Sequence, residues 1–270
     1  MAMKNQPHIS TREYIRWPPA DAYENTNTIV VTSAGGRFVD IRARIYDADS
    51  RGKNKAIPPF PPSCAAFKIY TYHPARLPPG IQSAEGTEWA FAGLASSEIK
   101  HNSDGDATTH CTWEHLIDSR TMKAEMVKDS GEMIPVENGR SLEKGKMENP
   151  YNPAAGEQSY EEGWVDVPVV SQRKDGKLET AVLQLMEDEV GARGMIVRVG
   201  QVVQGMLRVR EDYALERWIW KEKGGWKREL RDGSLFLPTG VMMDLGTIVL
   251  GDAVNYYDFP WKVVELGITD

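Results

Sequence analysis

The sequence has few of the residues and motifs on which common enzyme classes depend. It contains two cysteines, Cys64 and Cys111, and five histidines among 270 residues. It has no phosphate-binding glycine loop, no dinucleotide-binding G-x-G-x-x-G motif and no nucleophile elbow. His110, Cys111 and His115 form one histidine and cysteine cluster, but on an extended strand its two histidines point to opposite faces. We therefore expect neither a metal ion nor a cofactor.

The sequence also lacks a long apolar segment and an excess of positive charge. The longest apolar stretch, residues 236–250, is interrupted by proline, glycine and aspartate, so we expect no membrane span. With 32 Lys and Arg against 39 Asp and Glu, the net charge is −7. That balance argues against nucleic-acid binding and against docking on an anionic membrane. Few cysteines and no glycosylation sequon favour a reducing compartment, so we expect a cytoplasmic protein.

Apolar and polar residues alternate along much of the chain with a period of two, which is typical of half-buried strands. Turn-forming pairs such as Asn138-Gly139 and Gly224-Gly225 separate these runs. Many short strands with regular turns predict an all-β protein built as an antiparallel sandwich or barrel. Strands are expected within residues 39–45, 178–185, 195–203, 206–210, 215–221, 247–250 and 261–266.

Residues 50–83 differ in composition from the rest of the chain. The segment is rich in proline and begins with basic residues. Because proline cannot donate to a sheet ladder, we expect an excursion loop here, with a short edge strand at residues 65–72. A loop of this length is often functional, and a lid is the role we expect.

A weak internal repeat divides the chain into two halves. Residues 160–169 correspond to residues 257–266, and residues 138–142 correspond to residues 231–235. Upstream of these, Trp113 with Asp118 resembles Trp226 with Asp232. The shared order predicts two similar β-domains, residues 1–172 and 173–270.

Polar residues on otherwise apolar strand faces are the candidate functional groups. His115 shares a face with Trp113, where it is either hydrogen-bonded at a barrel rim or directed into a ligand cavity. Arg42 shares a face with Phe38 and Asp40, which is either a solvated outer face or the lining of a barrel. The tryptophans either fill the core or line a pocket. The candidate donors to a ligand are His115, Arg42, Arg198 and Tyr160, and the candidate cavity walls are Trp89, Trp113, Trp218, Trp220 and Phe38.

Eight segments in order along the chain carry a family resemblance. They are STREYIRWPP (10–19), TNTIVVTS (26–33), GRFVDIR (36–42), EWAFAG (88–93), HCTWEHLIDSR (110–120), YEEGW (160–164), ARGMIVR (192–198) and QGMLRVR (204–210). In these segments the sequence resembles the fungal HRI family, named for interaction with a yeast casein kinase. The resemblance spans nearly the whole chain, with residues 50–83 as its main departure. It implies two lipocalin-like β-barrels in one chain, a cytoplasmic location and protein partners.

A second similarity is one of fold and setting. Fungal biosynthetic pathways use lipocalin-like β-barrels as cofactor-free cyclases, including hetero-Diels–Alder enzymes of terpenoid pathways. Such an enzyme needs an aromatic cavity that orients the reactants and one or two donors that polarise an oxygen. We therefore expect a barrel that binds a hydrophobic small molecule. If it is catalytic, we expect a cofactor-independent cyclase of terpenoid or polyketide biosynthesis. The alternatives are a non-catalytic protein-interaction module and a carrier of lipophilic ligands.

Overall fold

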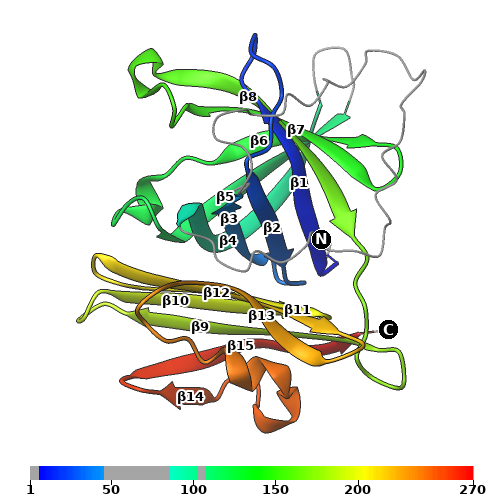
Figure 1. Ribbon diagram of the computed structural model, residues 1–270, viewed down its shortest axis with the longest axis vertical. Helices are drawn as coiled ribbons and strands as arrows, with labels where there is room; N and C mark the ends of the chain where they lie inside the picture. Colours follow the sequence, from blue (N-terminus) through cyan, green and yellow to red (C-terminus); the bar gives the residue numbers. More distant parts are fainter. Residues whose placement is uncertain (1–5, 46–85, 102–106, 270) are drawn as a thin grey trace.

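The computed structural model describes residues 6–45, 86–101 and 107–269. These residues form antiparallel strands joined by turns and short 3-10 helices, which confirms the all-β prediction (Figure 1). The first eight strands are β1 His8–Arg16, β2 Thr26–Thr32, β3 Arg37–Arg44, β4 Thr87–His101, β5 Ala107–Asp118, β6 Ser130–Val136, β7 Arg140–Glu148 and β8 Glu157–Val167. The others are β9 Leu178–Glu187, β10 Ala192–Val199, β11 Val202–Val209, β12 Asp212–Lys221, β13 Gly225–Gly233, β14 Ala253–Tyr256 and β15 Phe259–Thr269. The 3-10 helices are η1 Ala124–Met126, η2 Pro153–Ala155, η3 Thr239–Met243 and η4 Leu245–Thr247.

Strands β1–β8 form a closed barrel in which β8 returns to pair with β1. The hairpin turn between β6 and β7 contains Asn138 and Gly139, both at positive φ, as the Asn-Gly pair predicts. Bulges lie in β1, between Arg12 and Tyr14, and in β5, where Leu116 is the extra residue opposite Ala92 and Gly93. Such bulges bend strands where a sheet curves. Closure of the ring leaves this sheet without an edge strand.

On the barrel strand β3, alternation separates an inner face that carries polar groups from an apolar outer face. On β3, Phe38, Asp40 and Arg42 line an interior cavity, whereas Val39 and Ile41 face outward. The inner-face interpretation of the Arg42 strand is therefore correct, and the solvated outer face is not. Both faces of β3 are buried, because the outward residues are covered by the second half of the chain.

Strands β9–β15 form a second, curled seven-stranded sheet with the order β13-β12-β11-β10-β9-β15-β14 (Figure 1). The segment that contains η3 and η4 packs on one face of this sheet. Leu237, Met242 and Leu245 from that segment, together with Trp261 of β15, join one apolar cluster with the sheet residues. Gly194 on β10 makes room for this tryptophan, since a Cβ there would lie 2.2 Å from the Trp261 ring.

The opposite face of the second sheet packs on the outer wall of the barrel. Ile29, Ile41 and Ala90 from the barrel share one buried cluster with Met195 and Met206 from the sheet. The two layers lie one above the other in Figure 1. Apolar burial of this kind is the main favourable term in holding two sheets together.

Two buried polar side chains cross this apolar interface. Gln204 on β11 donates both amide hydrogens to barrel carbonyls, to Ile29 O and to Val39 O, at 2.8 Å each. Arg217 on β12 donates from Nε to Gln204 Oε1 at 2.6 Å, from one terminal nitrogen to Asn27 Oδ1 at 3.0 Å and from the other to Ile41 O at 2.9 Å. These bonds fix the position of the second sheet on the barrel, which apolar contacts alone do not specify.

Two strand predictions are wrong, and a third prediction lies outside the described residues. Residues 195–203 are not one strand, because the chain turns between β10 and β11 at Gly200, which has a φ of 48°. Residues 247–250 are not a strand, because η4 and a turn occupy them and the edge strand β14 begins at Ala253. The predicted excursion at residues 50–83 falls outside the described part of the chain.

Candidate functional site

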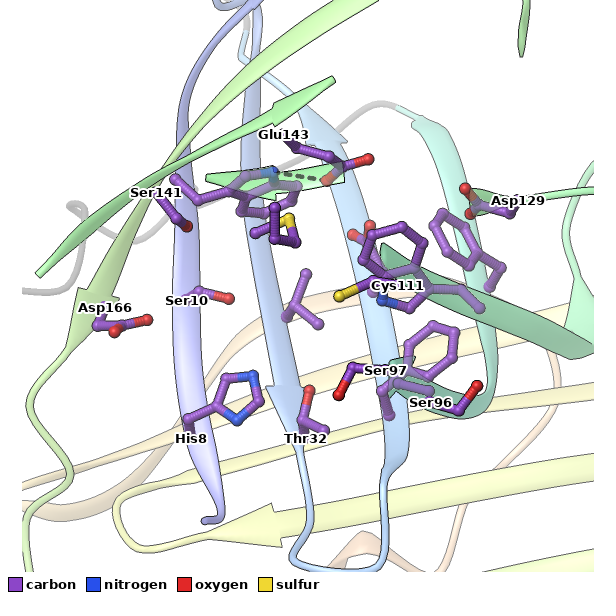
Figure 2. A pocket seen from close by; sticks show the side chains of 18 of the residues that line it. His8, Ser10, Thr32, Ser96, Ser97, Cys111, Asp129, Ser141, Glu143 and Asp166 are labelled. Atoms are coloured by element: carbon purple, nitrogen blue, oxygen red, sulfur yellow. Dashed lines mark hydrogen bonds between the residues drawn. The ribbon is translucent and has the colours of Figure 1, made fainter. Parts of the chain in front are cut away.

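The β1–β8 barrel encloses a cavity of about 210 Å³ (Figure 2). All eight strands contribute to its lining, which combines aromatic rings with hydroxyl and ionisable groups. In Figure 2, His8, Thr32, Ser96 and Ser97 lie toward one end of the cavity, and Glu143 lies toward the other. The lining residues are His8, Ser10, Val30, Thr32, Phe38, Asp40, Arg42, Phe91, Ala95, Ser96, Ser97, Cys111, Trp113, Asp129, Met133, Ser141, Glu143, Met147, Trp164 and Asp166.

A buried ion-pair network holds Arg42 in the cavity wall. Its Nε donates to Asp40 Oδ2 at 3.1 Å, and a terminal nitrogen donates to Glu162 Oε1 at 2.9 Å. The same Glu162 oxygen accepts from Arg12 at 2.5 Å, and Arg12 also donates to Glu24. The two guanidinium groups hold the pKa of Glu162 below its ordinary value despite complete burial.

Glu143 on β7 is a buried carboxyl group held by neutral donors. Tyr160 donates its hydroxyl to Glu143 Oε1 at 2.5 Å, and the indole nitrogen of Trp164 donates to Oε2 at 2.9 Å. Burial, with the nearby carboxylates of Glu162 and Asp129, raises the pKa of Glu143 to about 8. This group is therefore largely protonated at neutral pH, in the middle of a cavity wall.

His115 on β5 lies behind the cavity wall. Its two ring nitrogens bond Asp118 Oδ2 at 2.9 Å and Asp129 Oδ2 at 3.0 Å. The ring stacks on Phe91 at 4.2 Å between centroids, with an interplanar angle of 11°. Burial lowers the pKa of His115, but the bonds to the two aspartates outweigh it and the net shift is upward. The imidazole thus reaches the cavity only through Phe91 and Asp129, which line it.

Comparison with known proteins places this barrel in a family. Residues 8–265 match the protein family described as Protein HRI1. The chain belongs to the HRI1 family. An uncharacterized protein from Saccharomyces cerevisiae has a similar crystal structure, with a TM-score of 0.66 and 16% sequence identity over 97% of this chain and 100% of the yeast chain. At that identity the likeness establishes the fold alone. No curated protein matches the sequence.

In this HRI1-family chain, the sequence-predicted site residues fall into three groups. Arg42, Phe38 and Trp113 line the barrel cavity. His115, Tyr160 and Trp89 lie next to it, in contact with lining residues: Tyr160 with Glu143, and the other two with Phe91. Arg198, Trp218 and Trp220 belong to the second sheet and do not line this cavity.

The second-sheet candidates have structural partners of their own. Arg198 is buried, donates to Met242 O at 2.7 Å and forms an ion pair with Glu179 at 2.6 Å. Trp218 donates its indole hydrogen to Glu216 Oε2 at 2.8 Å. The structure therefore does not bring these side chains together with Arg42.

Sequence reasoning missed Glu143, Asp129 and Trp164 as lining residues. The signal for Glu143 is its position in the run Ser141, Glu143, Gly145, where alternate residues face inward. A Cβ at Gly145 would lie 2.5 Å from the Tyr160 hydroxyl, so this glycine leaves the space that Tyr160 needs to reach Glu143.

Two further properties of the HRI1-family chain bear on ligands and membranes. Within residues 6–45, 86–101 and 107–269, no group of three or more His, Cys, Asp or Glu side chains is placed to hold a metal ion. The helices in the same ranges are too short to cross a membrane. A smaller cavity of about 140 Å³, lined by residues such as Met122, Arg193 and Arg208, lies between the barrel and the second sheet.

The free thiol of Cys111 provides a chemical probe of the cavity. Burial, with the nearby Glu143 carboxylate, raises the pKa of Cys111 to about 11. We expect iodoacetamide to alkylate Cys111 about 100-fold more slowly at pH 8 than an exposed cysteine, because only the thiolate reacts. Mass spectrometry of a Cys64→Ser protein over pH 7–10 measures the rate, and the urea-unfolded chain is the control. Equal rates in the folded and unfolded chains would contradict the burial of this thiol.

Proposed function

We propose that the β1–β8 barrel binds one small organic molecule in its interior. The observation that carries this proposal is a cavity of about 210 Å³ inside a closed barrel, lined by aromatic rings together with hydroxyl and carboxyl groups. Ligand sites typically combine apolar surface with a few convergent polar groups, some with a perturbed pKa. Arg42, Asp40 and Glu143 are such groups.

The size of the cavity favours a single small ligand over a pair of reactants. Sites for drug-sized ligands usually measure about 300–1,000 Å³, and the cavity is about 210 Å³. A cofactor-independent cyclase of the hetero-Diels–Alder type must hold both the diene and the alkene components. We therefore propose binding as the function of the barrel and keep cyclisation as the catalytic alternative. In that alternative, Arg42 would be the donor that polarises a substrate oxygen.

Filling the cavity is the direct test of the proposal. Ser10 lies on the interior face of β1 and lines the cavity, so we expect Ser10→Phe to occupy the ligand space and weaken binding at least tenfold. Native mass spectrometry against a panel of cationic, neutral and anionic fragments identifies binders. Quenching of tryptophan fluorescence then gives Kd, because Trp113 and Trp164 line the site.

The matched control places the same side chain on the outside of the barrel. Ser159 on β8 is exposed, and we expect Ser159→Phe to leave Kd unchanged. Ligands that bind the Ser10→Phe and Ser159→Phe proteins equally well would place the site elsewhere. A panel with no binder at all would refute the binding function.

A protein-interaction module is the second candidate function. Two exposed aromatic residues in connections between strands of the second sheet favour it: Tyr257 is 72% exposed, and its ring lies 5.6 Å from that of Phe236, which is 49% exposed. Exposed aromatic residues are enriched at protein interfaces. In this case Phe236→Ser with Tyr257→Ser would abolish capture of a partner protein and leave small-molecule binding intact.

We also propose a cytoplasmic location, which the free thiol of Cys111 supports.

A further inference from the structure

Acidic side chains outnumber basic side chains around the barrel cavity. Four carboxyl groups line it, from Asp40, Asp129, Glu143 and Asp166. Among the described lining residues, Arg42 is the one arginine or lysine. A ligand that enters this space therefore meets more carboxyl groups than basic groups, which favours a cation over an anion.

The positive charge of Arg42 is already engaged. Its guanidinium donates to Asp40 and Glu162, and it lies over the rings of Trp89 and Phe91, at 5.0 and 5.4 Å from their centroids. An anionic ligand would have to compete with two buried carboxylates for this one group. Recognition of an anion by Arg42 is therefore unfavourable in this arrangement.

One carboxylate oxygen on the cavity wall has no partner. Asp40 gives one oxygen to Arg42, whereas its Oδ1 finds no hydrogen-bond donor among the described residues, although its side chain is only 3% exposed. Buried acceptors are normally satisfied. This oxygen therefore indicates a donor that the protein itself does not provide.

Aromatic rings complete the environment that an organic cation requires. Phe38, Phe91, Trp113 and Trp164 all line the cavity, and the Phe38 and Phe91 rings meet edge to face at 5.8 Å. The faces of aromatic rings attract cations, and aromatic cages are a common means of binding organic ammonium groups.

We propose that the ligand of the barrel is a small organic ammonium ion whose N–H groups donate to Asp40 Oδ1 and to the Glu143 carboxyl, with its carbon skeleton packed on the aromatic rings. This inference rests on the proposed binding function and specifies its ligand class. Ser10, Ser96 and Ser97 also line the cavity, and their hydroxyl groups can bond any further polar group of the ligand.

Glu143 gives the binding a pH dependence. The charged and titratable groups near it are Glu162 and Tyr160 on β8, Asp129 before β6, Arg42 on β3 and Cys111 on β5. Since its pKa is raised to about 8, an incoming cation favours loss of the Glu143 proton. Affinity for an ammonium ligand that stays protonated over this range therefore rises between pH 6.5 and 8.5, and binding at pH 7 releases a proton.

Four matched probes separate the ligand classes in a calorimetric titration at pH 7. They are benzylamine, which is charged at this pH, its permanently charged trimethylammonium analogue, neutral benzyl alcohol and anionic benzoate. We expect benzylamine to bind at least tenfold more tightly than benzyl alcohol, and benzoate to bind most weakly. The trimethylammonium analogue, which has no N–H to donate, should bind more weakly than benzylamine. Glu143→Gln and Asp40→Asn should each reduce the affinity for benzylamine at least tenfold, and by a larger factor than they reduce the affinity for benzyl alcohol.

The controls separate loss of the site from loss of the fold. Glu148→Gln removes the same charge from an exposed position on the same strand as Glu143, and it should leave all four affinities unchanged. Circular dichroism and the melting temperature establish that each variant folds. With two independent carboxyl variants, misfolding of one still leaves a test.

The outcomes distinguish failure of the cation inference from failure of the binding function. Equal or tighter binding of benzyl alcohol or benzoate, abolished by Ser10→Phe, would overturn the cation inference and leave the binding function intact. Benzylamine binding that both carboxyl variants retain would also overturn the inference. Failure of these probes together with the whole fragment panel would overturn both proposals.

Discussion

Replacing Arg217 with methionine is expected to lower the free energy of unfolding by about 3–5 kcal/mol. The Arg217 guanidinium is fully buried between the barrel and the second sheet, and burial lowers its pKa to about 10, so it stays charged at neutral pH. Its removal leaves three buried acceptors, on Gln204, Asn27 and Ile41, without their donor. Methionine restores the apolar volume but none of the hydrogen bonds, so the loss reports on the polar contacts.

Urea unfolding followed by tryptophan fluorescence measures this effect. The control is Arg228→Met, because Arg228 is 43% exposed and lies 3.9 Å from Glu216, and exposed pairs of this kind contribute about 0–1 kcal/mol. If Arg217→Met lowers the free energy of unfolding by less than about 1 kcal/mol, the three acceptors find other partners. That result would contradict the role of Arg217 as their donor.

Replacing Glu162 with glutamine is expected to lower the free energy of unfolding by a comparable amount, about 3–5 kcal/mol. The Glu162 carboxylate sits between Arg12 and Arg42, and the side chains of all three residues are at most 7% exposed. Glutamine keeps the shape but removes the one negative charge that the two guanidinium groups share. Removing one partner of a buried ion pair destabilises the fold, because the remaining charges stay buried without a counter-charge.

The Glu162 effect has a defined dependence on pH. Because the folded-state pKa of Glu162 is lowered, its carboxylate stabilises the fold above the unfolded-state pKa of about 4.3, and this contribution is lost as pH falls through the lower folded value. The difference between wild type and Glu162→Gln should therefore be constant from pH 8 to pH 5 and shrink below pH 4.

Glu161→Gln is the matched control for this experiment. Glu161 is the preceding residue on β8 and forms partly exposed pairs with Arg16 at 3.4 Å and Lys144 at 3.6 Å. Its replacement should cost about 0–1 kcal/mol. Equal losses from Glu161→Gln and Glu162→Gln at pH 7 would show that the buried network adds nothing to stability beyond a surface pair.

The sequence was most informative about which segments form strands. It also located the last strand of each half. Residues 160–169 contain most of β8, which pairs with the first barrel strand, and residues 257–266 overlap β15, which pairs with β9. The repeat thus identifies equivalent positions in the two sheets. The correspondence between residues 138–142 and 231–235 is weaker, because Asn138 lies in a hairpin turn whereas Asp232 lies near the end of β13. A division at residue 172 stays a prediction, and the shared interface leads us to propose that the two halves fold as one unit.

The site was only partly predictable, because local alternation does not reveal which face of a strand is inside. Arg42 and Ile41 alternate on β3, and the apolar residue would ordinarily face the core. Here both faces are buried, and the polar face lines the barrel. Glu143 escaped prediction because β7 is otherwise rich in charged residues typical of an exposed strand. Its role depends on Tyr160 and Trp164, which come from the next strand.

The apolar outer wall of the barrel has a consequence during protein synthesis. The last barrel strand, β8, ends at Val167, so the ring can close before the second sheet has left the ribosome. Until β10–β12 arrive, Ile29, Val31, Val39 and Ile41 face water. At elongation rates of about 5–20 residues per second, this interval lasts for seconds. We therefore expect the nascent chain to bind chaperones that recognise apolar surfaces, and separate production of the first half to leave that wall exposed.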